Sequence, residues 1–424
     1  MSRRTLIKAG AAGVVVVGAG GLIVARNVGG EAKTAGVDGD KSAGAHQLLL
    51  LTNEWNSIID DAAGRAAKIL GLPYRSTNFD KDDTVALTQA QSAVAAGQSL
   101  FLTNSADGSS LPGITAAAAQ NGGSLVNVGS SVPWVTPLDI GNAYTQQFTA
   151  REDIGFHEAV KEALRQAVAK FGEKLTILHV TGSPGSFDDA RRSDSVNRAV
   201  AEFPGARVLG SLPGNWASED GQKATEDLIA RYGVPNVIVA QNDGSLTGVL
   251  AALKGLNIAA GQQVLTVGVD GATDILRAIK EGTVAATAFQ SPTYFGVQAM
   301  ARLFDALNGY DFQAPERLVG FAGITVTKGN VDGVLARYVD NENLPFDPKL
   351  LSHVISGDKW DPQAPLAPLK IDEFYASQPK PAGYQLPAAY TESIKSGAFD
   401  EITQQYAKAY RLKLDDFGYQ GVQG

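Results

Sequence analysis

The sequence predicts an α/β protein with two doubly wound lobes, each built around a parallel sheet. Short apolar runs alternate with stretches of helical periodicity, which is the pattern of parallel strands joined by helical crossovers. This alternation occurs twice, in runs of about 100–140 residues, and each run is long enough to form one domain. The chain has 424 residues, of which 44% are hydrophobic and 19% charged, and this composition suits a globular protein of two or three domains.

The first run of alternating elements covers residues 47–149. Its predicted strands are bounded by polar residues or glycine and lie at 47–51, 74–78, 100–103, 125–128 and 146–149. Apolar residues at helical spacing predict helices between them, at 56–70, 83–96 and 110–120. Because a helix connects most successive strands, we expect right-handed crossovers and a parallel sheet.

The second run covers residues 154–289 and repeats the pattern. Its predicted strands lie at 175–180, 207–212, 237–240, 264–269 and 285–289, and its helices at 154–169, 188–203, 221–232, 245–256 and 273–281. One more helix is predicted at 294–307, followed by short strands at 318–321 and 324–326. Residues 331–424 are rich in Pro, Asp and Tyr and weakly periodic, apart from a helix at 399–409. We expect these residues to form an extended arm over the lobes instead of an independent domain.

The stretch 237–256 shows the junction between a strand and a helix most clearly. The apolar run VIVA at 237–240 ends in the polar cluster QNDG, and apolar residues then recur at helical spacing. In open α/β sheets, ligands bind at the carboxyl ends of the strands. We therefore expect Asn242 to contact a ligand and Asp243 to cap the helix and hold the loop. An ordinary turn with an Asx cap is the alternative interpretation.

The N-terminus has the features of an export signal. A pair of arginines at positions 3 and 4 precedes a Gly/Ala-rich apolar run at 9–25, which resembles a twin-arginine signal. This run is marginal as a permanent membrane span, which needs about 20 residues. We expect residues 1–45 to be an export signal and linker, and whether the signal is cleaved stays open.

A dinucleotide-binding loop is the alternative for the same region, because VVVV at 14–17 leads into GAGG. However, Ile23 stands where that motif needs its third glycine, and no second strand and helix follow in the linker at 29–45. Without residues 1–45, 30 of the 36 Lys and Arg and 41 of the 44 Asp and Glu remain, a net charge of −11. No basic patch indicates nucleic acid as a partner.

The residue types that most enzymes need are scarce. The chain has no cysteine, and its four histidines lack metal-ligand spacing. The sequence shows neither a paired nucleophile and base nor a glycine-rich phosphate loop. We therefore expect no catalysis, no metal and no cofactor.

Polar and aromatic side chains follow one predicted strand after another, where a cleft between two lobes would gather them. Asn, Asp, Arg and Gln form planar, often bidentate hydrogen bonds that suit pairs of hydroxyls. Tryptophan offers a flat apolar face for the C–H face of a sugar ring. The candidate ligand-binding residues are Asn53, Trp55, Asn104, Arg151, Arg192, Trp216, Asn242, Asp270 and Gln290.

Several candidates also have a purely structural interpretation. Trp55 suits core packing, and Arg192 suits a solvated helix surface. Asp270 is a plausible cap of the next helix, and Gln290 a turn residue before Pro292, where a strand must stop.

Three motifs in order, VAQND at 239–243, VGVDG at 267–271 and ATAFQSP at 286–292, resemble those of periplasmic sugar-binding proteins of the ribose-binding type. These are substrate-binding components of ABC importers, and the similarity covers residues 47–330. It implies two lobes joined by a three-segment hinge, with a ligand cleft between them. The implied crossings lie near 150–151, 291–292 and 323–327. The implied division is a first lobe of 46–149 and 291–324, a second lobe of 150–290 and 325–340, and a C-terminal extension of 341–424 packed on the lobes.

The resemblance also implies roles for the candidates. Asn53 and Trp55 match an asparagine and a stacking aromatic of the first lobe, and Asn104 matches a polar residue after the third strand. Arg192 matches an arginine that binds ring hydroxyls, with Arg191 as the alternative in a shifted alignment. The second lobe supplies the remaining matches, a stacking aromatic and three polar residues: Trp216, Asn242, Asp270 and Gln290.

Three departures from the family pattern point away from ribose itself. The stretch VGSS at 128–131 stands where monosaccharide binders usually have an acidic residue followed by an arginine, and Arg151 and Glu152 replace a small or acidic pair. Asn56 stands where the family usually has a second aromatic after Trp55. The departures favour another sugar, a polyol or a modified sugar, including an anionic one that contacts Arg151.

We therefore expect a monomeric, exported solute-binding protein that is periplasmic or extracytoplasmic. It would capture a sugar or polyol by lobe closure and deliver it to an ABC permease in the membrane. A sensory module that presents the ligand to a membrane receptor is the alternative. A repressor would need an N-terminal helix-turn-helix, and an exported cofactor enzyme would need a catalytic constellation, so neither is favoured.

Overall fold

The computed structural model describes residues 44–105 and 107–424 of the chain. The predicted export signal and linker, residues 1–45, lie outside the described residues except for Gly44 and Ala45. These two residues begin the first strand, so the sheet includes the end of the predicted linker. Within the described part, no helix combines the length and apolar character needed to cross a membrane.

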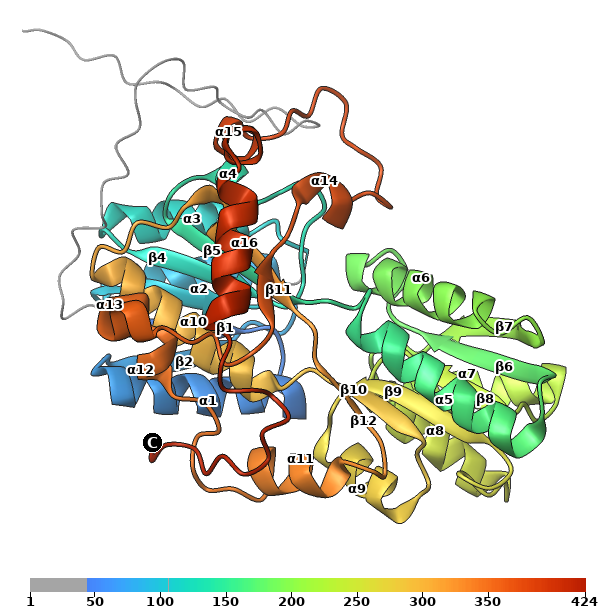
Figure 1. Ribbon diagram of the computed structural model, residues 1–424. Coiled ribbons are helices and arrows are strands. Elements are labelled where there is room, and N and C mark those ends of the chain that lie inside the picture. The colour runs from blue at the N-terminus through green and yellow to red at the C-terminus, as the bar shows by residue number, and fades with distance from the viewer. Residues whose placement is uncertain (1–43, 106) are drawn as a thin grey trace, which may run out of the picture. The chain divides into compact units, whose positions relative to one another are not determined.

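Seven strands form the first sheet: β1 (Gly44–Leu49), β2 (Tyr74–Asn78), β3 (Gln98–Thr103), β4 (Ser124–Val128), β5 (Tyr144–Ala150), β11 (Leu318–Phe321) and β13 (Leu366–Pro368). They lie side by side in the order β13-β11-β5-β4-β3-β1-β2. Figure 1 shows β4, β5 and β11 of this sheet in the left part of the molecule. Neighbours are parallel except at one edge, where β13 runs antiparallel to β11. This sheet and the helices packed on it are called the first lobe.

Six strands form the second sheet: β6 (Leu175–Thr181), β7 (Ala206–Pro213), β8 (Val237–Ala240), β9 (Leu265–Asp270), β10 (Ala286–Phe289) and β12 (Ile324–Val326). Their order is β12-β10-β9-β8-β6-β7, and β12 is the antiparallel edge strand. This sheet and its helices are called the second lobe. The predicted α/β fold with two doubly wound lobes is confirmed. Each sheet ends in one antiparallel edge strand, of which β12 was predicted as a strand at 324–326 and β13 was not predicted.

Helices cover the two sheets. Those of the first lobe are α1 (Glu54–Leu70), α2 (Asp83–Ala95), α3 (Leu111–Gln120), α4 (Pro137–Ile140) and α10 (Pro292–Leu307). Those of the second lobe are α5 (Gly155–Phe171), α6 (Phe187–Ala201), α7 (Ser218–Tyr232), α8 (Asp243–Gly255), α9 (Thr273–Glu281) and α11 (Val331–Tyr338). Eight of these helices agree with the sequence prediction except for one to three residues at their ends: α1, α2, α3, α5, α6, α7, α8 and α10. Helices α4 and α11 were not predicted.

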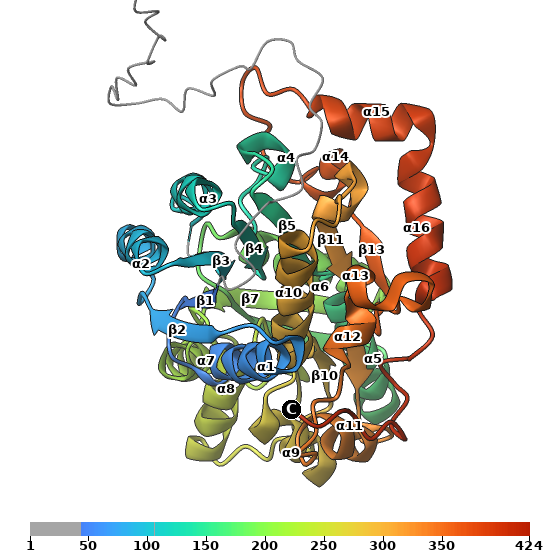
Figure 2. The same cartoon turned by 90° about the vertical axis from the view of Figure 1, so that its left-hand side faces the viewer.

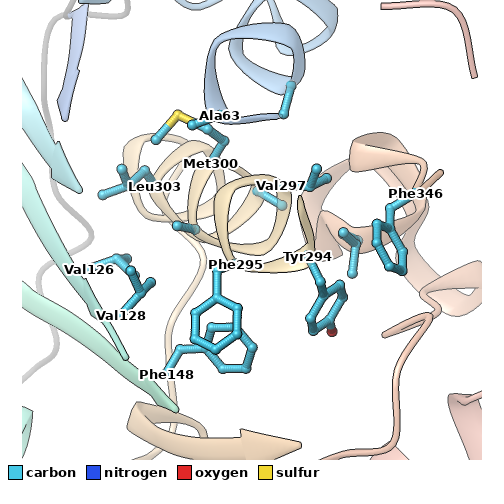
Figure 3. Packing of buried hydrophobic residues seen from close by; sticks show 14 of the residues in the cluster. Ala63, Val126, Val128, Phe148, Tyr294, Phe295, Val297, Met300, Leu303 and Phe346 are labelled. Atoms are coloured by element: carbon cyan, nitrogen blue, oxygen red, sulfur yellow. The ribbon is translucent and has the colours of Figure 1, made fainter. Parts of the chain in front are cut away.

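The core of the first lobe is centred on α10, which is almost entirely buried (Figure 3). Phe295 of this helix packs on Phe148 of the sheet, with ring centres 4.6 Å apart. On its other side α10 contacts the alanine-rich face of α1 through Gly296, where an added Cβ would lie 2.4 Å from the carbonyl oxygen of Ile59. The close approach of these helices therefore depends on glycine at position 296.

The chain passes between the lobes after β5, after β10 and after β11, and these passages contact one another. The amide of Arg151 donates to the carbonyl oxygen of Phe321 at 2.8 Å. At Gly323 an added Cβ would lie 2.2 Å from the carbonyl oxygen of Phe289. A fourth passage follows α11, because Phe346 enters the first-lobe core. The resemblance implied three of these segments, and the fourth belongs to the C-terminal extension.

The C-terminal extension, residues 341–424, is more ordered than its weak periodicity predicts. It contains β13, helices of nine and 12 residues and several single turns (Figure 2): α12 (Pro348–Leu351), α13 (His353–Ser356), η2 (Gly357–Lys359), α14 (Ile371–Phe374), α15 (Ala388–Ser396) and α16 (Ala398–Ala409). Trp360, Leu366 and Tyr406 belong to the first-lobe core. The expectation of an arm that lies over the lobes is thus corrected, because the extension completes the first sheet. Periodicity missed it because most of its elements span one turn or three residues.

Candidate functional site

A cavity of about 340 Å³ lies between the lobes, at the carboxyl ends of their strands. Eight of the nine candidate residues line it: Asn53, Trp55, Asn104, Arg192, Trp216, Asn242, Asp270 and Gln290. The topology explains this gathering, because parallel strands place their carboxyl ends at one edge and the crossings turn the two edges toward each other. Whether these residues bind a ligand stays a prediction.

The first lobe contributes one aromatic wall and two amides. Asn53 caps helix α1, and its Oδ1 accepts from the backbone amide of Asn56 at 2.9 Å. Trp55 lies in the first turn of that helix and packs edge-on against Phe295, with ring centres 5.3 Å apart. Asn104 accepts from the amide of Ser130 at 3.3 Å. Trp55 therefore packs against the core, as its structural interpretation predicts, and also lines the cavity.

The second lobe contributes the opposite aromatic wall, Trp216, from the loop between β7 and α7. Its backbone has a positive φ of 64°, in the left-handed region that few residues other than glycine adopt. The indole ring lies against Gly182, where an added Cβ would be 1.9 Å from a ring carbon. The Arg192 guanidinium carbon is 5.3 Å from the centre of the Trp216 ring. A glycine and an arginine thus hold this tryptophan in place.

Arg192 is buried at the base of the cavity and its N–H groups bind protein acceptors. Nε and Nη2 donate to Oε1 of Glu152 at 3.0 and 2.8 Å, and Nη2 also lies 3.4 Å from Oδ1 of Asp270. Nη1 donates to the carbonyl oxygen of Gln241. Gln290 reaches the same Glu152 oxygen from β10, at 2.9 Å. The interpretation of Arg192 as a solvated surface residue is therefore wrong.

Burial sets the protonation of this network. It raises the pKa of Asp270 to about 7, against the opposing effect of Arg192. Burial also raises the pKa of Asp188, a further carboxyl group that lines the cavity. For Arg192, burial lowers the pKa, but the carboxylates of Glu152 and Asp270 outweigh it and leave the pKa above its ordinary value. The guanidinium is therefore charged and neutralises part of the acidic base of the cavity.

The cap of α8 is Asn242 and not, as the sequence predicts, Asp243, while the ligand contact expected of Asn242 stays a prediction. Asn242 is the helix cap, since its Oδ1 accepts from the amide of Ser245 at 2.9 Å. Its Nδ2 donates to the carbonyl oxygen of Trp216 at 3.2 Å. Asp243 does not cap its own helix. Its fully buried carboxylate accepts instead from the amides of Gly271 and Ala272, both at 2.8 Å, and holds the neighbouring strand end.

Arg151 is the candidate that the structure does not bring to the cavity. Its side chain turns to Asp153, where Nε donates to Oδ1 at 2.8 Å, and it is absent from the cavity lining. The expected contact between Arg151 and an anionic ligand therefore has no support in the geometry. The expectation that ligand-binding residues follow the strand ends identified the correct turn after β5. In that turn, however, the residue that lines the cavity is Glu152, one position after Arg151.

Sequence reasoning missed several cavity residues besides Glu152. Lys81, Ser130, Asp188 and Asn215 also line it. Asp188 could have been predicted from the sequence, because it lies in the first turn of α6, shortly after the carboxyl end of β6. Ser130 donates its hydroxyl to Asp188 at 3.2 Å, so this pair joins the two lobes.

Comparison with known proteins places this geometry in a family. Residues 50–311, more than half of the chain, match the model of a periplasmic binding protein domain. A ribose import binding protein of Haemophilus influenzae is 26% identical over 266 residues, which is 62% of this chain and 85% of that protein. A xylitol-binding protein of Mycolicibacterium smegmatis is 28% identical over 284 residues, covering 66% of this chain and 75% of the relative.

Solved structures share the fold. A twin-arginine translocation pathway signal protein from Burkholderia phytofirmans superposes with a TM-score of 0.65 at 20% identity, over 71% of this chain and 94% of that one. A solute binding protein from Bacillus halodurans with bound myo-inositol has a TM-score of 0.59 at 18% identity, over 72% of this chain and 100% of that one. The family match at 50–311 leaves the C-terminal extension, residues 341–424, outside it.

Proposed function

The chain belongs to the periplasmic binding protein family, and from this premise we propose that it captures a sugar or sugar-like polyol between its lobes. The protein then delivers this ligand to an ABC import permease. The supporting observation is the placement of Trp55 and Trp216, which reach one cavity from different lobes. Two aromatic faces with amides and charged groups between them suit a ring with apolar C–H faces and polar edges.

The size of the cavity supports a small ligand. At about 340 Å³ it lies near the lower end of the range for ligand pockets, roughly 300–1,000 Å³. A volume of this size suits one monosaccharide or polyol better than an oligosaccharide. Relatives of this chain are named for ribose and for xylitol, which are molecules of this size class.

Lobe closure supplies the mechanism of capture. A ligand that contacts Trp55 and Asn104 of one lobe and Trp216 and Asn242 of the other makes all of these contacts when the lobes are together. Such a ligand shifts the population toward the closed form by its difference in affinity for the two forms. The permease then recognises the closed form. We propose that the protein does this as a monomer outside the cytoplasmic membrane, after export directed by residues 1–45.

Calorimetric titration of the purified protein against pentoses, hexoses, polyols and sugar acids tests the proposal. We expect at least one of these compounds to bind, and Trp216→Ala to weaken its binding by at least about tenfold, which corresponds to roughly 1.4 kcal/mol. Trp360→Phe is the matched control, because Trp360 lies in the first-lobe core and is not in the cavity lining. Failure of every compound to bind the folded wild-type protein would contradict the proposal.

A further inference from the structure

We propose that Glu152 contacts the ligand through its second carboxylate oxygen, and that the acidic base of the cavity restricts binding to uncharged, hydroxyl-donating ligands. Sugar acids are excluded. This inference rests on the proposed function and narrows its ligand class. It reverses the expectation of an anionic ligand that Arg151 raised in the sequence.

The two oxygens of Glu152 have unequal surroundings. Oε1 accepts three hydrogen bonds, two from Arg192 and one from Gln290, at 2.8–3.0 Å. Oε2 is buried and has no hydrogen-bond partner within the described residues. The whole residue is 3% exposed, yet it lines the cavity between the lobes.

A buried carboxylate oxygen without a donor is costly, because it has lost its water and gained nothing in return. The other groups around Glu152 already hold it rigidly through Oε1. A ligand hydroxyl that donates to Oε2 therefore forms a charge-assisted hydrogen bond at a position that is already ordered. A ligand carboxylate has no proton to donate there at neutral pH.

The charges around the cavity also disfavour an anionic ligand. Three acidic residues line it, Glu152, Asp188 and Asp270, against two basic ones, Arg192 and Lys81. Arg192 is committed to Glu152, Asp270 and the carbonyl oxygen of Gln241. Lys81 is exposed and sits outside the buried network. Burial raises the pKa of Asp188 and of Asp270, so these two groups carry less negative charge than exposed carboxylates would. An anion that reaches the base of the cavity therefore meets the Glu152 carboxylate, and the Arg192 guanidinium, the one among the described lining residues, is already paired with protein acceptors.

Arg151 does not compensate for this charge. Its Nη2 lies 2.5 Å from Oδ2 of Asp153, and Nε binds the other oxygen of the same carboxylate. This bidentate pair lies outside the cavity lining. The one arginine that the sequence offered for an acidic sugar is thus already neutralised elsewhere.

Matched pairs of compounds test the inference on the wild-type protein. Each pair shares a carbon skeleton and differs in one acidic group: xylitol with xylonate, and glucose with glucuronate. For any pair of which at least one member binds, we expect calorimetry at low salt to give the neutral compound an affinity at least about 100-fold higher than that of the acid. Equal or tighter binding of the acidic member overturns the inference and leaves the proposed function intact. Absence of binding by the whole sugar and polyol panel overturns the proposed function instead.

Substitution of Glu152 then tests its role. Glu152→Gln removes the charge and keeps the shape of the side chain. We therefore expect the neutral ligand to bind at least about tenfold more weakly, and the ratio of its affinity to that of the matching acid to become smaller. Glu162→Gln on α5 is the matched control, because its side chain is partly exposed and pairs with Arg165, away from the cavity. Unchanged affinity and preference in Glu152→Gln overturn the inference.

Deoxy analogues of the bound compound keep the test valid if Glu152→Gln folds poorly. On the wild-type protein, one deoxy compound must lack the hydroxyl that donates to Oε2 and bind at least about tenfold more weakly. In a folded variant, Glu152→Asp or Glu152→Gln, the same deoxy compound must lose much less affinity relative to its parent. A uniform loss across all deoxy compounds in both proteins contradicts a specific contact with Glu152.

Discussion

The guanidinium carbon of Arg191 lies 4.5 Å from the centre of the Phe374 ring. Arg191 is on α6 of the second lobe, whereas Phe374 ends α14 of the C-terminal extension, whose strand β13 belongs to the first sheet. Phe187 of α6 completes the contact, with its ring 5.4 Å from Phe374 and 5.2 Å from Tyr375. The extension therefore connects the two lobes beside the cavity, through residues beyond the family match at 50–311.

Removing this aromatic contact is expected to let the lobes separate more readily. Phe374→Ala removes a cation–π contact and an aromatic pair, each of about 0.5–2 kcal/mol, from the form in which the lobes touch. We expect small-angle X-ray scattering to show a larger radius of gyration for the unliganded variant. Ile394→Ala is the control, because Ile394 is an exposed residue of the same extension. An unchanged radius in Phe374→Ala would show that the contact does not restrain the lobes.

Asn242 and Asp243 are neighbours whose replacement should have separable effects. Asn242→Ala removes a helix cap and a cavity amide, so we expect weaker ligand binding and a stability loss of about 0.5–2 kcal/mol. Asp243→Ala leaves the amides of Gly271 and Ala272 and the hydroxyl of Thr287 without their acceptor. At about 1–3 kcal/mol for each unsatisfied group, we expect a loss of at least about 3 kcal/mol. Urea denaturation and calorimetry measure the two effects, and equal stability losses would refute this assignment.

Gly182 is expected to control the position of Trp216. Gly182→Ala places a methyl group where the indole ring now lies, so we expect the ring to move, binding to weaken and stability to fall by about 1–3 kcal/mol. Gly255→Ala is the matched control, because that position is helical and open, and alanine there should stabilise by about 0.5–1 kcal/mol. Thermal unfolding and tryptophan fluorescence check both results. Native fluorescence and binding in Gly182→Ala would contradict the close packing.

Asp270 should make the unliganded protein less stable as pH rises from about 4 to 7. Its pKa is about 7 in the folded protein against an ordinary value of 3.8, so the folded state holds the proton across this window and the unfolded state releases it. The free energy of unfolding therefore falls as pH increases, by on the order of 1.4 kcal/mol per pH unit from this group. Asp270→Asn should flatten this dependence in urea denaturation series. Parallel curves for the variant and the wild type would contradict the raised pKa.

The alternation of strands and helices could be predicted because each element buries its own apolar residues. The run at 237–240 is β8 as predicted, and the helix at 273–281 is α9 with the predicted bounds. The edge strand β13 could not be predicted, because LAP is three residues long and contains a proline. Its identity as a strand comes from pairing with β11, which is distant in sequence.

The candidate site was predictable to the level of a strand end and no finer. Eight candidates reached the cavity because parallel strands end at a common edge. Arg151 and Glu152 show the limit, since adjacent residues after β5 point in different directions and no periodic pattern operates in the turn. Arg192 likewise owes its place to partners 40 and 78 residues away in sequence, Glu152 and Asp270.

The sequence by itself determined the two-lobed α/β fold and the edges at which ligands bind, because periodicity and strand ends are local properties. The tertiary structure alone decided which charges meet in the cavity and that the C-terminal extension connects the lobes. Both depend on contacts between residues far apart in the chain, such as Arg191 with Phe374. The local pattern of apolar and polar residues does not indicate which distant residues will be in contact.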